Sequence, residues 1–126
     1  MSDGTASVPS ETADPQPSVL TDISREMVRL YKEQFGRGPT RARTNFAGPN
    51  VVLCTLEDSL TPAERRLVEM DEHQRLRDVR LFFQHASESE LCSIVETALN
   101  RKVRAFVSGI DTRTDVSAEV FYLEPA

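Results

Sequence analysis

Apolar residues recur along the chain at spacings that predict a first helix beginning near residue 21. The helical stripe consists of Ile23, Met27, Leu30, Tyr31 and Phe35. Thr21 or Asp22 can cap this helix, because a short side-chain oxygen accepts from the free backbone N–H groups of a first turn. Gly36, Gly38 and Pro39 are expected to end it, since glycine adopts the left-handed cap conformation and proline prevents resumption.

Two strands are predicted next, on either side of a turn at residues 48–50. In the first strand Ala42, Thr44 and Phe46 alternate with polar residues, which is the period of two of a half-buried strand. The second strand, Val51 to Leu56, is almost entirely apolar. A run of this kind is typical of a central strand that is covered on both faces.

A long middle helix is predicted from Thr61 to about Gln84, opened by the capping box Thr61-Pro62-Ala63-Glu64. A surface helix needs one apolar stripe. This segment has two, and the second comprises Val68, Leu76, Val79 and Phe83. Two stripes indicate burial on two sides, a kink near residues 71–74, or a subunit interface. We expect those four residues to form a dimer or partner interface, since one four-stranded sheet cannot easily cover both stripes.

The last part of the chain predicts a helix and a second hairpin. A second capping box at residues 87–90 precedes a helical stripe, whose members are Leu91, Ile94, Val95, Ala98 and Leu99. Asn100 is the expected C-cap, and alternating strands follow on either side of a turn at residues 109–115. The order α-β-β-α-α-β-β predicts an α+β fold, with a four-stranded, mainly antiparallel sheet and helices on one face. Residues 22–57 and 88–124 share the helix-hairpin order, which raises the possibility of an internal repeat.

Composition and charge limit the number of domains, the class of partner and the location that the chain can have. The 126 residues are enough for one domain, which we place at residues 21–126. Residues 1–20 are proline-rich, contain three acidic residues and no Lys or Arg, and predict a disordered acidic leader. A net charge of −5 argues against a nucleic-acid partner, which needs a basic surplus. Without a signal peptide or an apolar run of about 20 residues, we expect a cytoplasmic protein that does not insert into a membrane.

The residue types that carry chemistry form no catalytic set, so we expect no enzyme activity, cofactor or metal. Cys54 and Cys92 lie in apolar runs and are expected to be buried, reduced thiols. His73 and His85 lie over three helical turns apart and cannot share an ion, and His73 is expected on a solvated face. Glu57 and Asp58 are adjacent carboxylates in a loop, and we expect both to be solvated. The mixed charges of the middle helix are also expected to be exposed.

One segment could contact an anion. Gly36-Arg37-Gly38-Pro39 is first of all a helix end, but Arg37 and Gly38 could form a backbone nest with Arg41 and Arg43 nearby. These four residues are therefore a candidate contact for an anion or an acidic partner. They support an alternative interpretation of the chain as a small-ligand or anion-binding regulatory domain.

The pattern as a whole resembles the MpsC-type domain family. The resemblance covers residues 22–124 and rests on five segments: Gly36-Arg37-Gly38-Pro39, Val51–Leu56, Leu60–Glu64, Val103–Asp111 and Glu119–Leu123. It implies a soluble accessory protein that acts beside a cation-translocating membrane transport complex. Together with the two-striped middle helix, it favours a non-enzymatic interaction module that forms a homodimer and docks on a larger assembly.

Overall fold

The structure is a computed structural model that describes residues 17–126, and it contains four helices and four strands in that part of the chain. Their bounds are α1 Pro17–Phe35, β1 Arg41–Phe46, β2 Val51–Glu57, α2 Pro62–Glu69, α3 His73–Ala86, α4 Glu88–Leu99, β3 Val103–Asp111 and β4 Val116–Leu123. Residues 1–16 of the expected leader lie outside the described residues. Its last four residues belong to α1, so the predicted boundary at residue 20 is wrong there.

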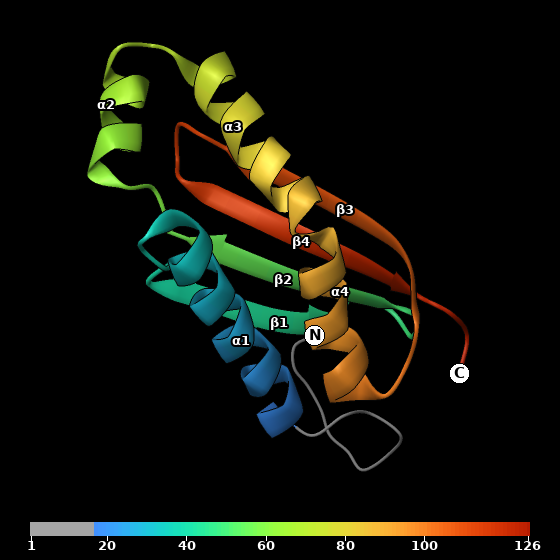
Figure 1. Ribbon diagram of the computed structural model, residues 1–126. Coiled ribbons are helices and arrows are strands. Elements are labelled where there is room, and N and C mark those ends of the chain that lie inside the picture. The colour runs from blue at the N-terminus through green and yellow to red at the C-terminus, as the bar shows by residue number, and fades with distance from the viewer. Residues whose placement is uncertain (1–16) are drawn as a thin grey trace.

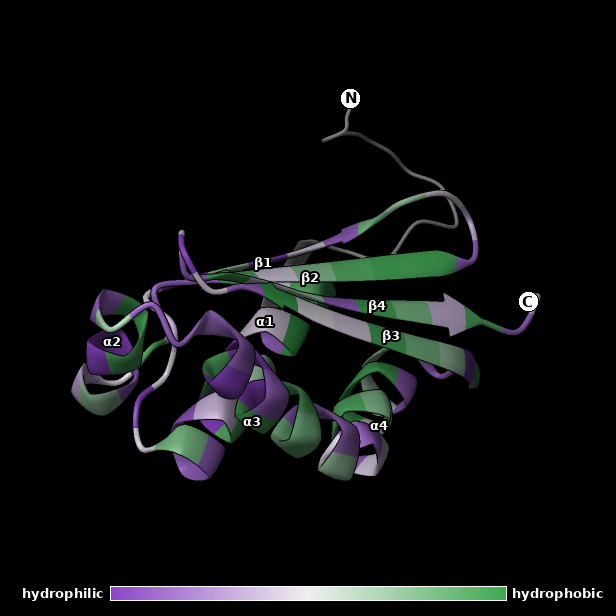
Figure 2. Cartoon of the chain, turned by 90° about the horizontal axis from the view of Figure 1, so that it is seen from above, coloured by the Kyte–Doolittle hydropathy of each residue, from purple (hydrophilic) through white to green (hydrophobic). Residues whose placement is uncertain are grey.

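The four strands form one antiparallel sheet in the order β1-β2-β4-β3. Helices α1, α3 and α4 pack against one face of this sheet, and α2 lies beyond one end of it (Figures 1 and 2). The predicted α+β class with an antiparallel sheet and helices on one face is confirmed. Each helix-hairpin unit contributes one central and one edge strand, which is the arrangement an internal repeat would have.

The middle segment forms two helices, so the expected single helix is wrong, and the break falls where a kink near residues 71–74 was one of the expected alternatives. The capping box forms as predicted: the Thr61 side chain accepts from the Glu64 N–H at 3.2 Å, and the Glu64 side chain accepts from the Thr61 N–H at 2.8 Å. The helix ends at Glu69 because Asp71 takes a left-handed backbone conformation with φ of 59°. A right-handed helix cannot pass through such a residue, and α3 starts afresh at His73.

The second predicted capping box does not form. The Ser87 side chain makes no cap hydrogen bond, and its backbone (φ −97°, ψ 9°) is far from the extended conformation of an N-cap. Instead the Ser87 N–H donates to the Phe83 carbonyl, so α4 follows α3 with one residue between them. The predicted C-terminal ends of two helices are confirmed, because Gly36 (φ 81°) ends α1 and Asn100 (φ 54°) caps α4. The predicted cap of the first helix at Thr21 or Asp22 is wrong, because α1 begins at Pro17 and both residues lie inside it.

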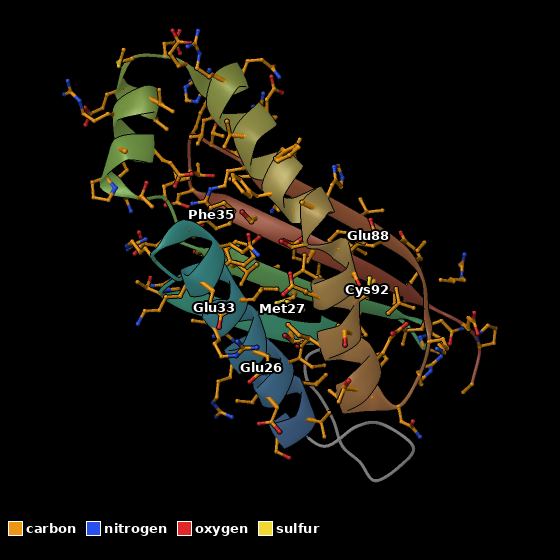
Figure 3. All side chains as sticks on the ribbon, in the orientation of Figure 1. Glu26, Met27, Glu33, Phe35, Glu88 and Cys92 are labelled. Carbon is orange, nitrogen blue, oxygen red and sulfur yellow. The ribbon has the colours of Figure 1, made fainter. Side chains whose placement is uncertain are left out.

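The core lies between the helices and the sheet, and both predicted helical stripes contribute to it. Its fully or almost fully buried apolar members are Ile23, Met27, Leu30, Tyr31, Val52, Cys54, Leu56, Leu91, Val95, Phe121 and Leu123. In Figure 3, Met27 of α1 lies between α1 and α4. Burial of these apolar side chains holds α1 and α4 against the centre of the sheet.

The second strand is covered on one face only, contrary to the expectation of cover on both. Val52, Cys54 and Leu56 point toward the helices and are fully buried. Val51 and Leu53 alternate with them and are partly buried on the opposite face. None of the helices described for residues 17–126 lies over that face (Figure 2). We call it the open face of the sheet.

Candidate functional site

The four residues of the predicted anion contact are not brought together around one point. The Arg37 guanidinium donates to Asp58 Oδ2 at 3.1 Å, and to the carbonyl oxygens of Asp58 and Leu60 at 2.5 and 3.3 Å. Gly38 lies against α1, where a Cβ atom would come within 3.0 Å of the Val28 carbonyl oxygen. The loop after α1 is thus held against the loop before α2.

The two remaining arginines of that group lie on β1. Arg41 and Arg43 alternate with Thr44, which is buried on the helix side, so both point to the open face. The Arg41 side chain is 78% exposed and lies 4.0 Å from Glu57. Both side chains therefore lie at one edge of the open face, whereas Arg37 is bonded to the loop before α2.

The predicted interface residues are divided between interior and surface. Leu76 is buried within the chain at 1% exposure, and Val68 is partly buried. Val79 and Phe83 are exposed at 45% and 37%, and Phe82, between them on α3, is 67% exposed. We call Val79, Phe82 and Phe83 the α3 patch. Leu76, Val79 and Phe83 all belong to α3, so the division lies within one helix, and the break at Asp71 separates only Val68 from the other three.

A small hollow borders the α3 patch, between α1, α3 and α4. Its lining residues are Leu30, Tyr31, Gln34, Phe35, Phe83, Gln84, Ser87 and Leu91. The Phe83 ring packs edge-on against Phe35, with centroids 5.8 Å apart, and against Phe82 at 5.6 Å. Phe35 stands at the end of α1 that approaches α3 (Figure 3). The patch and the hollow therefore form one continuous apolar surface on the helix side.

A buried polar centre lies at the inner end of this hollow. Tyr31 Oη donates to Glu119 Oε2 at 2.5 Å, and Gln84 Nε2 donates to Tyr31 Oη at 2.9 Å and to Glu119 Oε2 at 3.1 Å. Glu119 is fully buried, and this burial raises its pKa to about 7, although the donated hydrogen bonds oppose the rise. Burial and the neighbouring carboxylate also raise the pKa of Tyr31 well above its usual value.

The polar centre is only partly satisfied. Glu119 Oε1, Gln84 Oε1 and the Ser117 hydroxyl oxygen are buried and make no hydrogen bond of ordinary length among the described residues; the Ser108 hydroxyl is likewise unpaired by distance, although it lies near enough to Glu119 to lower the pKa of that carboxyl group. Ser108 pairs directly with Glu119 across the strands, so these groups share the covered face. Leaving buried polar atoms unpaired is costly. The centre therefore stabilises the fold less than its three hydrogen bonds alone would suggest.

The sequence alone did not single out Glu119. Both phases of β4 are apolar, with Phe121 and Leu123 in one and Val120 and Tyr122 in the other, so alternation cannot say which phase is covered. In the structure the phase that contains Glu119 faces the helices. Glu119 alternates in the same set as Phe121 and Leu123, which are large and apolar, and this is the signal that could have pointed to its burial.

A charged network fixes the loop before α2. The Asp115 carboxylate accepts from the backbone N–H groups of Ser59 and Leu60 at 2.9 and 3.1 Å. Asp58 forms ion pairs with Arg37 and Arg65. Hydrogen bonds from Thr40 and then Arg37 are the largest influences that lower the pKa of Asp58. The expectation that Asp58 is merely solvated is wrong, because it joins three segments of the chain.

Arg80 is the largest departure from the expected exposed charges of the middle helix. Its side chain is 0% exposed, and it donates to Glu64 at 2.5 and 2.7 Å and to the Ser59 carbonyl oxygen at 2.9 Å. The guanidinium carbon also lies 3.7 Å from the centroid of the Phe35 ring. Arg80 thereby connects α3 to the start of α2 and to the end of α1.

These observations can be set beside known proteins. The sequence model of one family, described as "Na+-translocating membrane potential-generating system (MpsC)", matches residues 16–125. The chain belongs to the MpsC family. No curated protein and no solved structure matches it. The family match begins close to the start of α1, six residues before the resemblance that the sequence analysis described.

In this MpsC-family chain the thiols and histidines show no reactive grouping. Cys54 and Cys92 are both free, with Cys54 buried and Cys92 partly buried, and burial raises their pKa values to about 12 and about 11. His73 is not solvated as expected: its side chain is 12% exposed, and Nδ1 lies 2.8 Å from Thr112 Oγ1. Within residues 17–126, no three His, Cys, Asp or Glu side chains are grouped to hold a metal ion.

Among the helices described between Pro17 and the C-terminus of this MpsC-family chain, none combines the length and the apolar character needed to cross a membrane.

Proposed function

We propose that this chain is a non-enzymatic, dimeric accessory component of a Na+-translocating, membrane-potential-generating system, acting in the cytoplasm. The observation that carries the proposal is the family match over residues 16–125. The family description names a membrane system, and a component of such a system acts on it through contacts with its other subunits.

The α3 patch supports an interaction role. Phe82 is 67% exposed and Val79 is 45% exposed, on a helix whose opposite side is buried through Leu76 and Arg80. Exposed aromatic residues beside a hollow are typical of protein-binding surfaces, because they bury much area at a small cost in conformational entropy. We propose that a subunit of the membrane system binds here.

Three carboxylates around the start of α2 also support a non-enzymatic role. Catalytic acids and bases must be free to exchange protons with a substrate. Asp58, Glu64 and Asp115 are instead held by arginines and backbone N–H groups that join neighbouring segments. Their geometry is that of a rigid scaffold for binding surfaces.

The test is affinity capture of the tagged full-length chain from its native host, scored for identified subunits of a cation-translocating membrane system. We expect those subunits to co-purify with the wild type, and recovery to fall about tenfold or more with Phe82→Glu, which places a charge in the α3 patch. Ser93→Glu, at an exposed position of α4, is the matched control and should retain capture. Equal recovery with both variants would overturn the role of the patch, and the absence of such subunits would overturn the proposed function.

A further inference from the structure

The open face of the sheet is apolar across its three neighbouring strands β2, β4 and β3. The strand register places Leu53, Val120 and Val107 in one row, and Val51, Tyr122 and Ala105 in the next. Val107 is 55% exposed, and none of the described helices covers either row (Figure 2). A soluble domain rarely leaves a continuous apolar surface of this kind without a partner.

One row of this face ends in opposite charges at its two edges. Arg41 lies on β1 at one edge, and Asp111 lies at the end of β3 on the other. They belong to the same row across the sheet, because Arg41 pairs with Glu57, Glu57 with Val116, and Val116 with Asp111. The face is therefore basic at the β1 edge and apolar in the middle, while the β3 edge carries Asp111 at one end and, further along, Arg104, whose guanidinium carbon lies 5.6 Å from the centroid of the Tyr122 ring.

The row that ends in Arg41 and Asp111 is complementary to itself. If a second copy is stacked face to face by a two-fold axis that runs parallel to the strands between β2 and β4, β1 of each copy lies over β3 of the other. Rows are preserved, so Arg41 of one copy lies opposite Asp111 of the second, and Leu53 opposite Val120. A two-fold axis perpendicular to the strands would instead place β1 over β1 and bring the arginine edges together.

We propose that the open face is the interface between two copies of this chain, stacked about an axis parallel to the strands. This inference rests on the proposed dimeric state and specifies the surface and orientation that produce it. Packed sheets lie about 10 Å apart with strands within about 30° of alignment, a geometry that flat rows of Val, Leu and Ala accept. The dimer thus uses the sheet side and leaves the α3 patch available.

The size of the face sets the strength of the dimer. Four strands spaced about 4.8 Å apart, each about seven residues long at about 3.3 Å per residue, give a flat footprint of roughly 440 Å². A standard stable interface buries about 800 Å² of accessible surface per partner. The face has about half that area and falls in the class of weak, transient interfaces, so we expect the dimer to dissociate reversibly in the micromolar range.

Gly109 is consistent with close approach at the β3 edge. It occupies the row of Arg43 and Ala118, and a Cβ atom added there would meet nothing within 4 Å. Glycine inside a strand weakens it, and often marks a place where another chain comes close. In the proposed dimer, Gly109 leaves room for the Arg43 side chain of the second copy.

The test is sedimentation equilibrium of the full-length chain over a wide range of concentration. We expect a reversible monomer–dimer equilibrium for the wild type. Val120→Lys, near the two-fold axis, should weaken association by about a hundredfold or more, since it buries an unpaired charge, while its circular dichroism and thermal unfolding stay close to those of the wild type. Phe82→Glu on the α3 patch is the control and should dimerise as the wild type does.

A double-mutant cycle tests the orientation. Asp111→Asn removes the charge but keeps a side-chain oxygen for the hydrogen bonds from the Arg113 and Thr114 N–H groups. It and Arg41→Gln should each weaken the dimer about two- to fivefold, and the double variant should be no weaker than either, because the two groups pair across the interface. Additive effects would overturn the parallel axis.

Three outcomes would overturn the interface itself. A wild type that stays monomeric at about 100 µM, well above the micromolar range expected, shows that no second copy binds. A Val120→Lys variant that dimerises as the wild type does shows that another surface is used. A monomeric wild type whose capture of membrane-system subunits is lost with Val120→Lys assigns the open face to that partner. In the last case the proposed function would stand without the dimer, whereas loss of capture with Phe82→Glu alone concerns the α3 patch.

Discussion

On the helix-covered face of β4, the residues in the middle of the strand are Ser117 and Glu119, whereas on its open face they are Ala118 and Val120. Thr44 of β1 is likewise buried on the covered face, where its hydroxyl lies 2.7 Å from the Ser24 hydroxyl. The covered face is therefore the more polar of the two near its centre. Polarity alone does not decide which side of a sheet is covered, since polar groups can be accommodated where partners are supplied.

The difference between the faces separates stability from association. The covered face contains the large buried side chains and the hydrogen-bonded centre, so it determines whether the chain folds. The open face is apolar but shallow, and it has little effect on the fold of one copy. Substitutions on the covered face should therefore be tested by measuring unfolding, and substitutions on the open face by measuring association.

The largest expected effect comes from adjacent aromatic residues on opposite faces. Phe121→Ala removes a fully buried ring that packs on Phe106, with centroids 5.3 Å apart, and should lower the free energy of unfolding by about 3–5 kcal/mol. Tyr122→Ala, on the open face, should cost about 1 kcal/mol. Urea unfolding in dilute solution, where association does not contribute, measures both. Equal costs would show that the open face is as deeply covered as the other.

A second prediction concerns the buried charge on the covered side. Arg80→Met should lower the free energy of unfolding by about 3 kcal/mol, because it leaves Glu64 without its cationic partner and the Ser59 carbonyl without a donor. Arg75→Met is the matched control on α3: the Arg75 side chain is 72% exposed, so the change should stay within about 0.5 kcal/mol. An Arg80→Met variant as stable as the control would show that the buried pair only offsets its own desolvation.

The third prediction is a pH dependence that arises from Glu119. Its pKa is about 7 in the folded chain against an ordinary value of 4.5, so between these values the unfolded chain loses a proton that the folded chain keeps. Stability should therefore fall as the pH rises through this window, by on the order of 3 kcal/mol in total, and then level off. Glu119→Gln should remove this fall, and be more stable than the wild type at about pH 8.

Chemical unfolding at intervals from about pH 4 to about pH 8 measures this dependence. Tyr31→Phe sharpens the test, because it removes a donor to the carboxylate and should shift the fall in stability to higher pH. If Glu119→Gln and the wild type show the same pH profile, the carboxyl group is ionised and compensated in the folded chain.

The parts of the fold that could be predicted from the sequence depend on local periodicity. The stripes of α1 and α4, the two hairpins and the Thr61 capping box each involve residues close together in the chain, and each is confirmed. The positions of the helix ends at Gly36 and Asn100 follow from backbone conformations that few residues adopt. Local patterns of this kind also carried the family resemblance.

What could not be predicted depends on contacts between distant segments. Arg80 belongs to a run of mixed charges and is buried because Glu64 and Ser59 come from another element to meet it. Glu119 is buried because the helices cover the phase of β4 that contains Ser117 and Glu119, although the other phase, with Ala118 and Val120, is the more apolar. The two apolar stripes allowed a kink near residues 71–74 as one of three alternatives, but the left-handed conformation of Asp71 that produces the break could not be predicted. Of the predicted interface, Val79 and Phe83 lie in the α3 patch, whereas Leu76 of the same helix is buried.

The smallest expected effect uses the same substitution at neighbouring residues of one strand. Val52→Thr places a hydroxyl group in the fully buried core and should cost about 1–3 kcal/mol. Val51→Thr makes the same change on the open face, where water can reach the hydroxyl, and should stay within about 0.5 kcal/mol in dilute solution. Both are measured by urea unfolding, and the pair controls for the intrinsic preferences of valine and threonine in a strand.

Repeating the Val51→Thr measurement at high protein concentration makes the comparison sharper. If the open face joins two copies, the cost of Val51→Thr should rise with concentration while that of Val52→Thr stays constant, because only the former hydroxyl becomes buried on association.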